Sequence, residues 1–366
     1  MTRSRGIIRP MSGRQRPPIC TLMLVTFMAC AGQGDVVTPL SQSRTSTSPP
    51  TTSTSPSTTS TAAAATTTTQ YASPAITASI EVTGGPFDLA IAAENLWIER
   101  HRHDGLSRLD PGTLTIEEVA DVSVHCSVEA AAGAIWTANA HTSILTKVDP
   151  ATAAALATYR ITDVCGVAGT DTRIWVVSPG EPISIIRELD PNNGEELATI
   201  EVPELSFGLS LDDDVLWAVG EGGGGWLAKI DPHRAEVVSL QDTGRYYDGL
   251  VPGFGALWAV SRAESFLRRL NRETGEVETQ IDVGASPNSI TVAYDSIWVV
   301  RLTGDLVRVD PITNTVVADE HLLDVVGNTL PFTAYIAPLG GSLWISALER
   351  GLVVQVDPKK VASTSP

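Results

Sequence analysis

Apolar and polar residues alternate along most of this chain in short runs that have the two-residue period of β-strands. Residues 296–300 (Ser-Ile-Trp-Val-Val) are rich in β-branched side chains and fit a half-buried strand. Residues 305–309 form a second such run, which ends at Asp310-Pro311. We expect a turn there, because proline presets the backbone and the Asp310 carboxylate can accept hydrogen bonds from backbone N–H groups. Two further runs complete a unit of four strands, 289–293 and 315–318.

The same unit recurs seven times with a period of about 40 residues. Each copy has a tryptophan on its second strand: Trp97, Trp136, Trp175, Trp217, Trp258, Trp298 and Trp344. Each copy then reaches its turn, which begins at Asp110, Asp149, Asp190, Asp231, Asn271, Asp310 or Asp357. No helical period of comparable length is present in the repeats. The pattern predicts an all-β, seven-bladed β-propeller with one blade in each repeat.

The seventh repeat lacks a fourth strand, because the chain ends soon after the turn at Asp357. A matching strand precedes the first repeat, since residues 76–83 have the apolar pattern of residues 277–284, a fourth strand elsewhere in the chain. We therefore predict that the N-terminal strand pairs with the last blade and closes the ring. The propeller then spans residues 75–360, and residues 361–366 form a disordered tail.

Residues 1–30 have the composition of a signal peptide, with five arginines before the apolar run 19–29, which is too short to span a bilayer. Two cleavage sites compete. The Ala-Cys-Ala sequence around Cys30 fits the small-x-small site of a secreted protein, whereas residues 27–30 resemble a bacterial lipobox in which Cys30 carries lipid. Residues 31–74 are rich in Ser, Thr and Pro and predict a disordered linker. We favour a lipoprotein of the cell envelope, with a freely secreted extracellular protein as the alternative.

The charge of the chain limits its partners. The formal net charge is −17 at pH 7, and no basic stripe interleaved with aromatic residues is visible. Such a surface repels nucleic acid and anionic lipid. We expect a monomer that binds no nucleic acid and meets the membrane only through the lipid anchor.

Two cysteines lie at equivalent positions of neighbouring repeats. Cys126 and Cys165 each precede the tryptophan of their repeat by ten residues, at the head of an inner strand. The oxidising conditions outside the cell permit a disulfide between them. The alternative is a pair of small buried thiols that are too far apart to bond.

Histidines gather on one predicted face of the ring, where each inner strand begins and each second strand hands over to the third. His101, His103, His125 and His141 belong to this group. On an extended segment His101 and His103 would point the same way, and with Asp104 they could hold a divalent metal ion. The alternative is a set of solvated loop histidines, because no ligand spacing here is diagnostic.

Aromatic residues form a second group on the same face. Tyr246, Tyr247 and Asp248 precede the fifth inner strand, and Trp226 follows four consecutive glycines. These residues could frame a pocket in which a sugar, peptide or aromatic ligand stacks and forms hydrogen bonds. Alternatively, the aromatic rings only cover the tops of the blades.

Two short phrases carry a family resemblance. The sequence Thr-Asn-Thr-Val-Val at 313–317 resembles the YVTN-type surface-layer propeller repeat, and Gly-Ala-Leu-Trp at 255–258 resembles the repeats of the streptogramin (virginiamycin B) lyases. The resemblance covers residues 76–358 and implies a propeller fold more than a function. In the lyases, a Glu-x-His-Gly sequence at the head of an inner strand supplies the base beside a magnesium ion. The equivalent ring in this chain contains no histidine: Phe87, Cys126, Cys165, Phe207, Asp248, Asn288 and Ala334.

His125 is offset by one position from that ring, and strand alternation would turn it to the other face. No Gly-x-Ser-x-Gly turn for a serine nucleophile is present either. We therefore assign no catalytic residue and expect an exported binding or interaction module for a protein, small molecule or glycan. A metal-assisted lyase and a structural surface-layer component are the alternatives.

Overall fold

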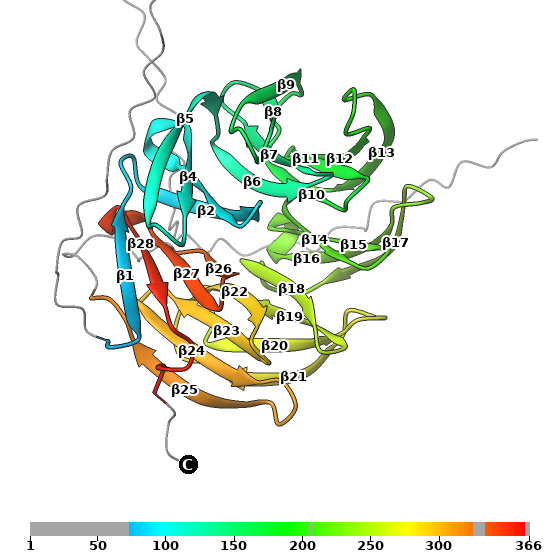
Figure 1. The fold of residues 1–366 in the computed structure, drawn as a ribbon. Coiled ribbons are helices and arrows are strands. Elements are labelled where there is room, and N and C mark those ends of the chain that lie inside the picture. The colour runs from blue at the N-terminus through cyan, green and yellow to red at the C-terminus, as the bar shows by residue number, and fades with distance from the viewer. Residues whose placement is uncertain (1–72, 205, 325–333, 363–366) are drawn as a thin grey trace, which may run out of the picture. The chain divides into compact units, whose positions relative to one another are not determined.

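The computed structural model describes residues 73–204, 206–324 and 334–362. Figure 1 shows seven four-stranded antiparallel sheets arranged as the blades of a propeller. The first four blades are formed by β2 (Pro86–Ala92), β3 (Asn95–Arg100), β4 (Gly105–Asp110) and β5 (Thr115–Ser123); β6 (Cys126–Ala131), β7 (Ala134–Asn139), β8 (Ile144–Val148) and β9 (Ala155–Arg160); β10 (Gly166–Gly169), β11 (Ile174–Ser178), β12 (Ile183–Leu189) and β13 (Glu196–Pro203); β14 (Ser206–Asp212), β15 (Val215–Gly220), β16 (Trp226–Asp231) and β17 (Glu236–Asp242).

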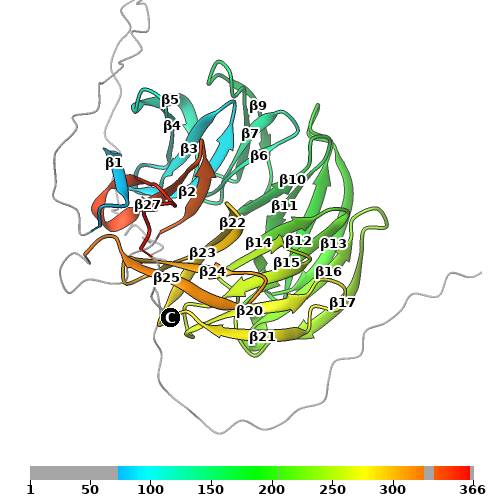
Figure 2. The same ribbon diagram turned by 60° about the horizontal axis from the view of Figure 1, so that its bottom comes forward.

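The remaining blades continue this order around the ring. They are formed by β18 (Gly249–Gly253), β19 (Ala256–Val260), β20 (Phe266–Asn271) and β21 (Val277–Asp282); β22 (Pro287–Ala293), β23 (Ser296–Arg301), β24 (Asp305–Asp310) and β25 (Thr315–His321); β26 (Ile336–Leu339), β27 (Ser342–Ala347), β28 (Leu352–Val356) and β1 (Ile76–Glu81). Figure 2 shows the first strands of the blades, such as β6, β10 and β14, nearest the middle of the ring. The predicted all-β, seven-bladed propeller is confirmed.

The repeated tryptophans are the core of the blades, and each is at most 1% exposed. In blade 2 the Trp136 indole N–H donates to the Ala131 carbonyl oxygen at 3.0 Å. The Lys147 ammonium lies 5.5 Å from the centre of the Trp136 ring and donates to the Pro191 carbonyl of the next blade at 2.7 Å. Burial of the ring, a cation–π contact and a bond between blades explain why the tryptophan and its neighbours recur at a fixed period.

The Asp-Pro turns form as the sequence predicts. In blade 6 the Asp310 carboxylate accepts hydrogen bonds from the backbone N–H groups of Ile312 at 2.7 Å and Thr313 at 3.1 Å. These bonds lower the pKa of Asp310 below its usual value. Asp110 and Asp149 hold their turns in the same way.

The ring closes through the N-terminal strand, as predicted. Strand β1 pairs with β28 in antiparallel register, with Ile80 opposite Val353. Ile80 is 1% exposed and packs in one cluster with Leu96 and Ile98 of blade 1 and Trp344 of blade 7. The strand therefore fills the contact between the first and last blades as well as completing a sheet.

The described residues include three short 3-10 helices: η1 (His101–His103), η2 (Gly222–Gly224) and η3 (Leu348–Arg350). Within these described ranges, no helix has both the length and the apolar character needed to cross a membrane. The predicted signal peptide (1–30), its lipidation residue Cys30 and nearly all of the linker (31–74) lie outside the described residues.

Candidate functional site

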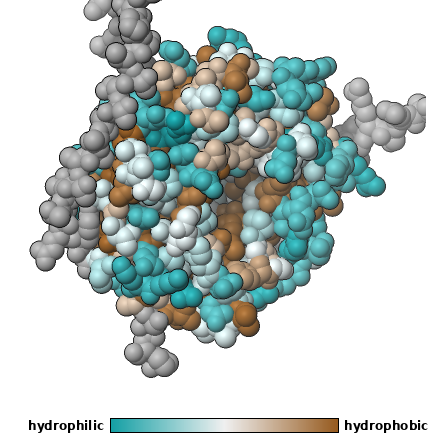
Figure 3. All heavy atoms as spheres, viewed as in Figure 1, coloured by the Kyte–Doolittle hydropathy of each residue, from teal (hydrophilic) through white to brown (hydrophobic). Residues whose placement is uncertain are grey.

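The candidate site lies where blades 1 and 2 meet at the end of the central channel. Its side chains come from the end of β3, from η1, from the residue before β6 and from the turn after β7. We call this side of the ring the upper face; it carries Glu99, His101, Asp104, His125 and His141. The space-filling view in Figure 3 shows the ring hollowed near its centre.

Glu99 is a charged residue in a position that the other blades fill with small or apolar side chains. It follows Trp97 by two residues and is 0% exposed. One Glu99 oxygen lies 2.9 Å from Nδ1 of His101, and the other oxygen has no hydrogen-bond partner. Burying a carboxylate is costly unless it is paired, so this residue is not explained by packing. The equivalent residues elsewhere are Ala138, Val177, Val219, Val260, Val300 and Ser346.

Three histidines of the site stack in a column. The ring centres of His101 and His125 are 4.5 Å apart, and those of His125 and His141 are 3.8 Å apart. The Phe87 ring continues the column beyond His101 at 4.5 Å. The column crosses from blade 1 to blade 2, so it depends on the way these two blades pack together.

Asp104 joins this column from the loop that follows η1. Its carboxylate lies 3.0 Å from Nδ1 of His125 and 3.5 Å from Nδ1 of His141. Burial lowers the pKa of His125 below its usual value, and the neighbouring His101 and His141 lower it further. His125 therefore favours the neutral form, which can accept a hydrogen bond or bind a metal ion.

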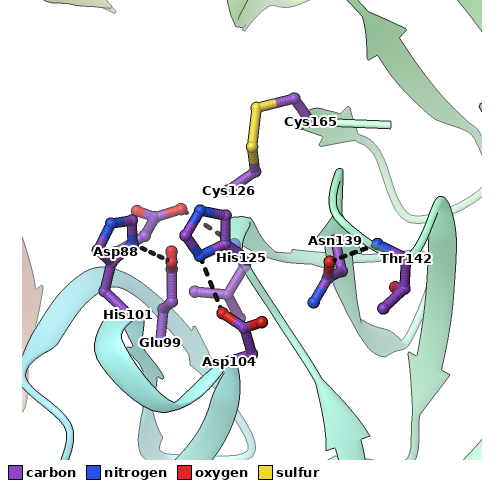
Figure 4. Close-up of a disulfide and its surroundings, with 10 residues drawn as sticks. Asp88, Glu99, His101, Asp104, His125, Cys126, Asn139, Thr142 and Cys165 are labelled. Atoms are coloured by element: carbon purple, nitrogen blue, oxygen red, sulfur yellow. Dashed lines mark hydrogen bonds and ion pairs between the residues drawn. A yellow bond between two sulfur atoms is a disulfide. The ribbon is translucent and has the colours of Figure 1, made fainter. Parts of the chain in front are cut away.

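Two overlapping groups of side chains could hold a metal ion. The first group is Glu99, His101 and His125, and the second is Asp104, His125 and His141. Within each group, one ligand atom from every residue lies within 4.8 Å of the others. Figure 4 shows the first group and Asp104 below the disulfide. The histidine that could bind a metal ion together with His101 is therefore His125.

His103 lies outside both groups, contrary to the predicted pairing with His101. Residues 101–103 form the 3-10 helix η1, so the alternation of an extended segment does not apply. The exposed His103 ring instead packs over Gly84, where an added Cβ would lie 2.8 Å from the ring. The prediction for His125 also needs correction, because His125 precedes β6 and strand alternation does not turn it away from the upper face.

Two further carboxyl groups lie on the inner strands beside this cluster. Asp88 on β2 accepts hydrogen bonds from the backbone N–H groups of Leu89 at 2.9 Å and Val128 at 3.0 Å, which ties blade 1 to blade 2. Burial raises the pKa of Asp88 to about 7, with a further contribution from the Glu99 charge. Burial, followed by the charge of Asp88, raises the pKa of Glu129 on β6 to about 8. Both groups therefore exchange protons near neutral pH.

Asp88, Glu99 and Glu129 were not predicted as site residues, although two of them depart from the repeat. Glu99 is the only charged residue two positions after a repeat tryptophan. Glu129 pairs across the sheet with Trp136 and is likewise the only charged residue among its equivalents, which are Ala90, Ala168, Ser210, Val251, Thr291 and Ala337.

Cys126 and Cys165 are joined by a disulfide beside His125, with their Cα atoms 5.0 Å apart. The bond links the heads of the inner strands of blades 2 and 3, and Figure 4 shows it next to the His125 ring. The disulfide therefore restrains the backbone at Cys126, the residue directly after His125.

The predicted aromatic pocket in blades 4 and 5 does not fit the burial of two of its members. Trp226 is 5% exposed, donates its indole N–H to the Glu204 carbonyl at 3.1 Å and packs over Gly220. Tyr247 is 3% exposed and packs in the cluster around Trp217. Both rings are packing residues rather than solvent-facing stacking surfaces.

Tyr246 and Asp248 are partly buried residues, and the Asp248 side chain is 6% exposed. The Asp248 carboxylate accepts from the Arg262 backbone N–H at 2.7 Å and pairs with the Arg262 guanidinium at 2.5 Å. Burial raises the pKa of Asp248, and burial together with the Asp248 charge raises that of Tyr246. These residues form a polar group of their own in blade 5.

Comparison with known proteins shows the fold. No protein-family model and no curated protein sequence matches the chain. Solved structures similar to it include a chain of the mitotic checkpoint complex, with a TM-score of 0.64 and 11% identity over 81% of this chain and 96% of that chain. A streptogramin B lyase has a TM-score of 0.60 and 18% identity over 75% and 95%. A chain of the hydrazine synthase of Kuenenia stuttgartiensis has a TM-score of 0.59 and 13% identity over 75% and 95%.

These likenesses show the β-propeller fold alone. Each similar chain is less than 20% identical to this one, and propellers host many unrelated functions.

Proposed function

We propose that this protein is an exported, surface-tethered β-propeller that binds a small molecule, glycan or peptide at the upper face of blades 1 and 2. The single observation that carries this proposal is the convergence of Glu99, His101, Asp104, His125 and His141 at one end of the channel. Residues that repeat from blade to blade serve packing, whereas these residues interrupt the repeat.

The chemistry of the site indicates which ligands fit. Carboxylates and neutral imidazoles accept hydrogen bonds, so the ligand should present donors such as hydroxyl or amine groups. The His141 side chain is 59% exposed and ends the column of rings, so one of its faces is open for stacking. A polyol or a basic peptide meets both requirements.

Export and tethering are supported by residues 1–74. The basic and apolar composition of residues 1–30 fits an export signal, Cys30 fits the lipidated position, and the Ser/Thr/Pro-rich linker would hold the domain away from the membrane. The disulfide between Cys126 and Cys165 fits an oxidising compartment.

Arrays of immobilised glycans and amine-bearing peptides test the binding proposal. Ligands retained by the wild-type protein should be lost from His141→Ala and weakened by Asp104→Asn. His233→Ala is the matched control, because His233 is exposed in the turn of blade 4 and pairs with Asp214 away from the site. Equal retention by the wild type and His141→Ala would place the binding surface elsewhere, and assembly of the protein into sheets would favour a structural surface-layer role.

A metal-assisted lyase is the second candidate. The observation that favours it is the group of Glu99, His101 and His125 next to Asp88, whose carboxyl group has a pKa of about 7 and could move a proton. Incubation with streptogramin B, followed by mass spectrometry of the products, distinguishes the two functions. Catalytic turnover would establish the lyase, whereas retention of the compound without conversion would support binding.

A further inference from the structure

We propose that Glu99, His101 and His125 form a binding site for one divalent transition-metal ion of the zinc class. This inference deepens the proposed function, since the metal ion would lie in the same upper-face site. It concerns a feature that can be measured without knowing the ligand.

Two buried polar atoms without hydrogen-bond partners point to a cation-binding site. Glu99 Oε2 and His125 Nδ1 are both buried and both lack a hydrogen-bond partner. The Glu99 side chain is 0% exposed, so bulk solvent does not reach this oxygen. His125 Nδ1 lies 3.0 Å from Asp104 Oδ1 without forming a hydrogen bond to it. Leaving such atoms unsatisfied is costly, and a bound cation would satisfy both.

The spacing of the donor atoms fits one small ion. The ligand atoms of Glu99, His101 and His125 all lie within 4.8 Å of one another, and Glu99 Oε1 is already 2.9 Å from His101 Nδ1. Zinc binds histidine nitrogen and carboxylate oxygen at about 2.0–2.2 Å, so ligand atoms on one ion lie about 3–4 Å apart. Small rotations of side chains would therefore bring the three donors onto one ion.

The types of donor select the class of metal. Two imidazole nitrogens and one carboxylate oxygen suit zinc, cobalt, nickel and copper, whereas magnesium and calcium prefer oxygen ligands throughout. Three protein ligands leave a fourth position for water or a ligand group. Asp104, whose side chain is 42% exposed, lies 3.0 Å from Nδ1 of His125 and places a negative charge beside the proposed ion from the solvent side.

A second group shares His125 and has to be distinguished from the proposed site. Asp104 and His141 complete that group, and both are more exposed than Glu99. The orphaned Glu99 oxygen favours the inner group, because Asp104 and His141 can be hydrated without a metal ion.

Titration of the EDTA-treated full chain with Zn²⁺ and with Co²⁺ tests the inference. Isothermal calorimetry should show one ion bound per chain, and the visible spectrum of bound Co²⁺ should report nitrogen and oxygen ligands in a low-coordinate site. Glu99→Gln, His101→Ala and His125→Ala should each weaken binding by about 100-fold or more, and Asp104→Asn by about 10-fold. The controls His103→Ala and His233→Ala should bind like the wild type.

Three outcomes would overturn the inference. These are no uptake by the wild type, wild-type affinity in Glu99→Gln and His101→Ala, or a loss confined to Asp104→Asn, His125→Ala and His141→Ala, which would assign the ion to the outer group. Thermal unfolding of every variant identifies misfolding. If Glu99→Gln does not fold, the partly exposed His101 keeps the test decisive. If the protein binds the metal ion but retains no glycan or peptide on the arrays, the metal site is supported and the proposed binding function is refuted.

Discussion

Replacing Ile80 with alanine probes the closure of the ring at its most buried point. Ile80 is 1% exposed in strand β1, the strand by which the described N-terminal residues complete the last blade. It packs against Trp344 and Val353 of blade 7 and against Leu96 and Ile98 of blade 1. The substitution should therefore weaken the sheet of the last blade and the contact between the two end blades together.

The expected loss can be worked out from the atoms removed. The change deletes three buried carbon atoms, each worth about 0.8 kcal/mol of transfer free energy. The cavity left behind adds to this, and measured Ile→Ala changes in protein cores cost about 2–5 kcal/mol. We expect the free energy of unfolding to fall by about 3–4 kcal/mol, because neighbours from two blades cannot easily collapse into the gap.

Urea denaturation of the purified protein, followed by tryptophan fluorescence, measures this loss. Glu81→Ala is the matched control, since Glu81 is the exposed last residue of the same strand and should change stability by no more than about 0.5 kcal/mol. If Ile80→Ala unfolds within about 1 kcal/mol of the wild type, β1 does not hold the ring closed, and the packing argument is refuted.

Three other predictions concern separate parts of the chain. The double variant Cys126→Ala/Cys165→Ala should unfold at lower urea concentration, with a loss of about 2–4 kcal/mol for a sequence separation of 39 residues; an unchanged midpoint under non-reducing conditions would mean that the bond does not constrain the unfolded chain. The raised pKa of Glu129, about 8, means that the folded protein binds more protons than the unfolded chain between about pH 4.5 and 8, so wild-type stability should fall as the pH rises through this window. Glu129→Gln should remove that loss and be more stable than the wild type by about 1–2 kcal/mol at pH 9 and equal to it at pH 4; the exposed Glu276→Gln is the control, and equal stability at pH 9 would contradict the argument. Cys30→Ser should move the protein from the membrane fraction to the medium, because lipid attachment needs the thiol; equal partitioning would support cleavage at the small-x-small site.

The fold could be predicted because packing repeats it seven times. The tryptophan is buried at the same place in each blade, and the turn aspartate caps the same backbone N–H groups. The repeat also predicted ring closure, because the last repeat lacks a fourth strand and a matching strand, β1, precedes the first repeat. A wrong strand assignment in one repeat is corrected by comparison with the other six, so the periodicity was enough to predict the architecture and the closure of the ring.

The site was only partly predictable, because it lies where the repeat fails. The histidines could be assigned to the upper face, but their partners depend on local geometry: η1 separates His101 from His103, and His125 precedes the first residue of β6. Tyr247 and Trp226 look like exposed aromatics in sequence, yet the blades close over them. Whether a loop side chain turns inward depends on contacts between blades that no local pattern encodes.

Glu99 offers the sharpest separation of stability from function. Four other blades have valine at its position, and all four of those valines are at most 4% exposed. Burying a carboxylate is costly, and His101, whose side chain is 25% exposed, can exchange its lost partner for water. Glu99→Val should therefore raise the urea midpoint by an amount equivalent to about 1–2 kcal/mol while abolishing metal uptake, as expected of a residue that is retained at a cost in stability. Val177→Ala at the equivalent position of blade 3 should only destabilise. A fall in stability for Glu99→Val would show that the carboxylate holds the His101 column in place, and its role would then be structural.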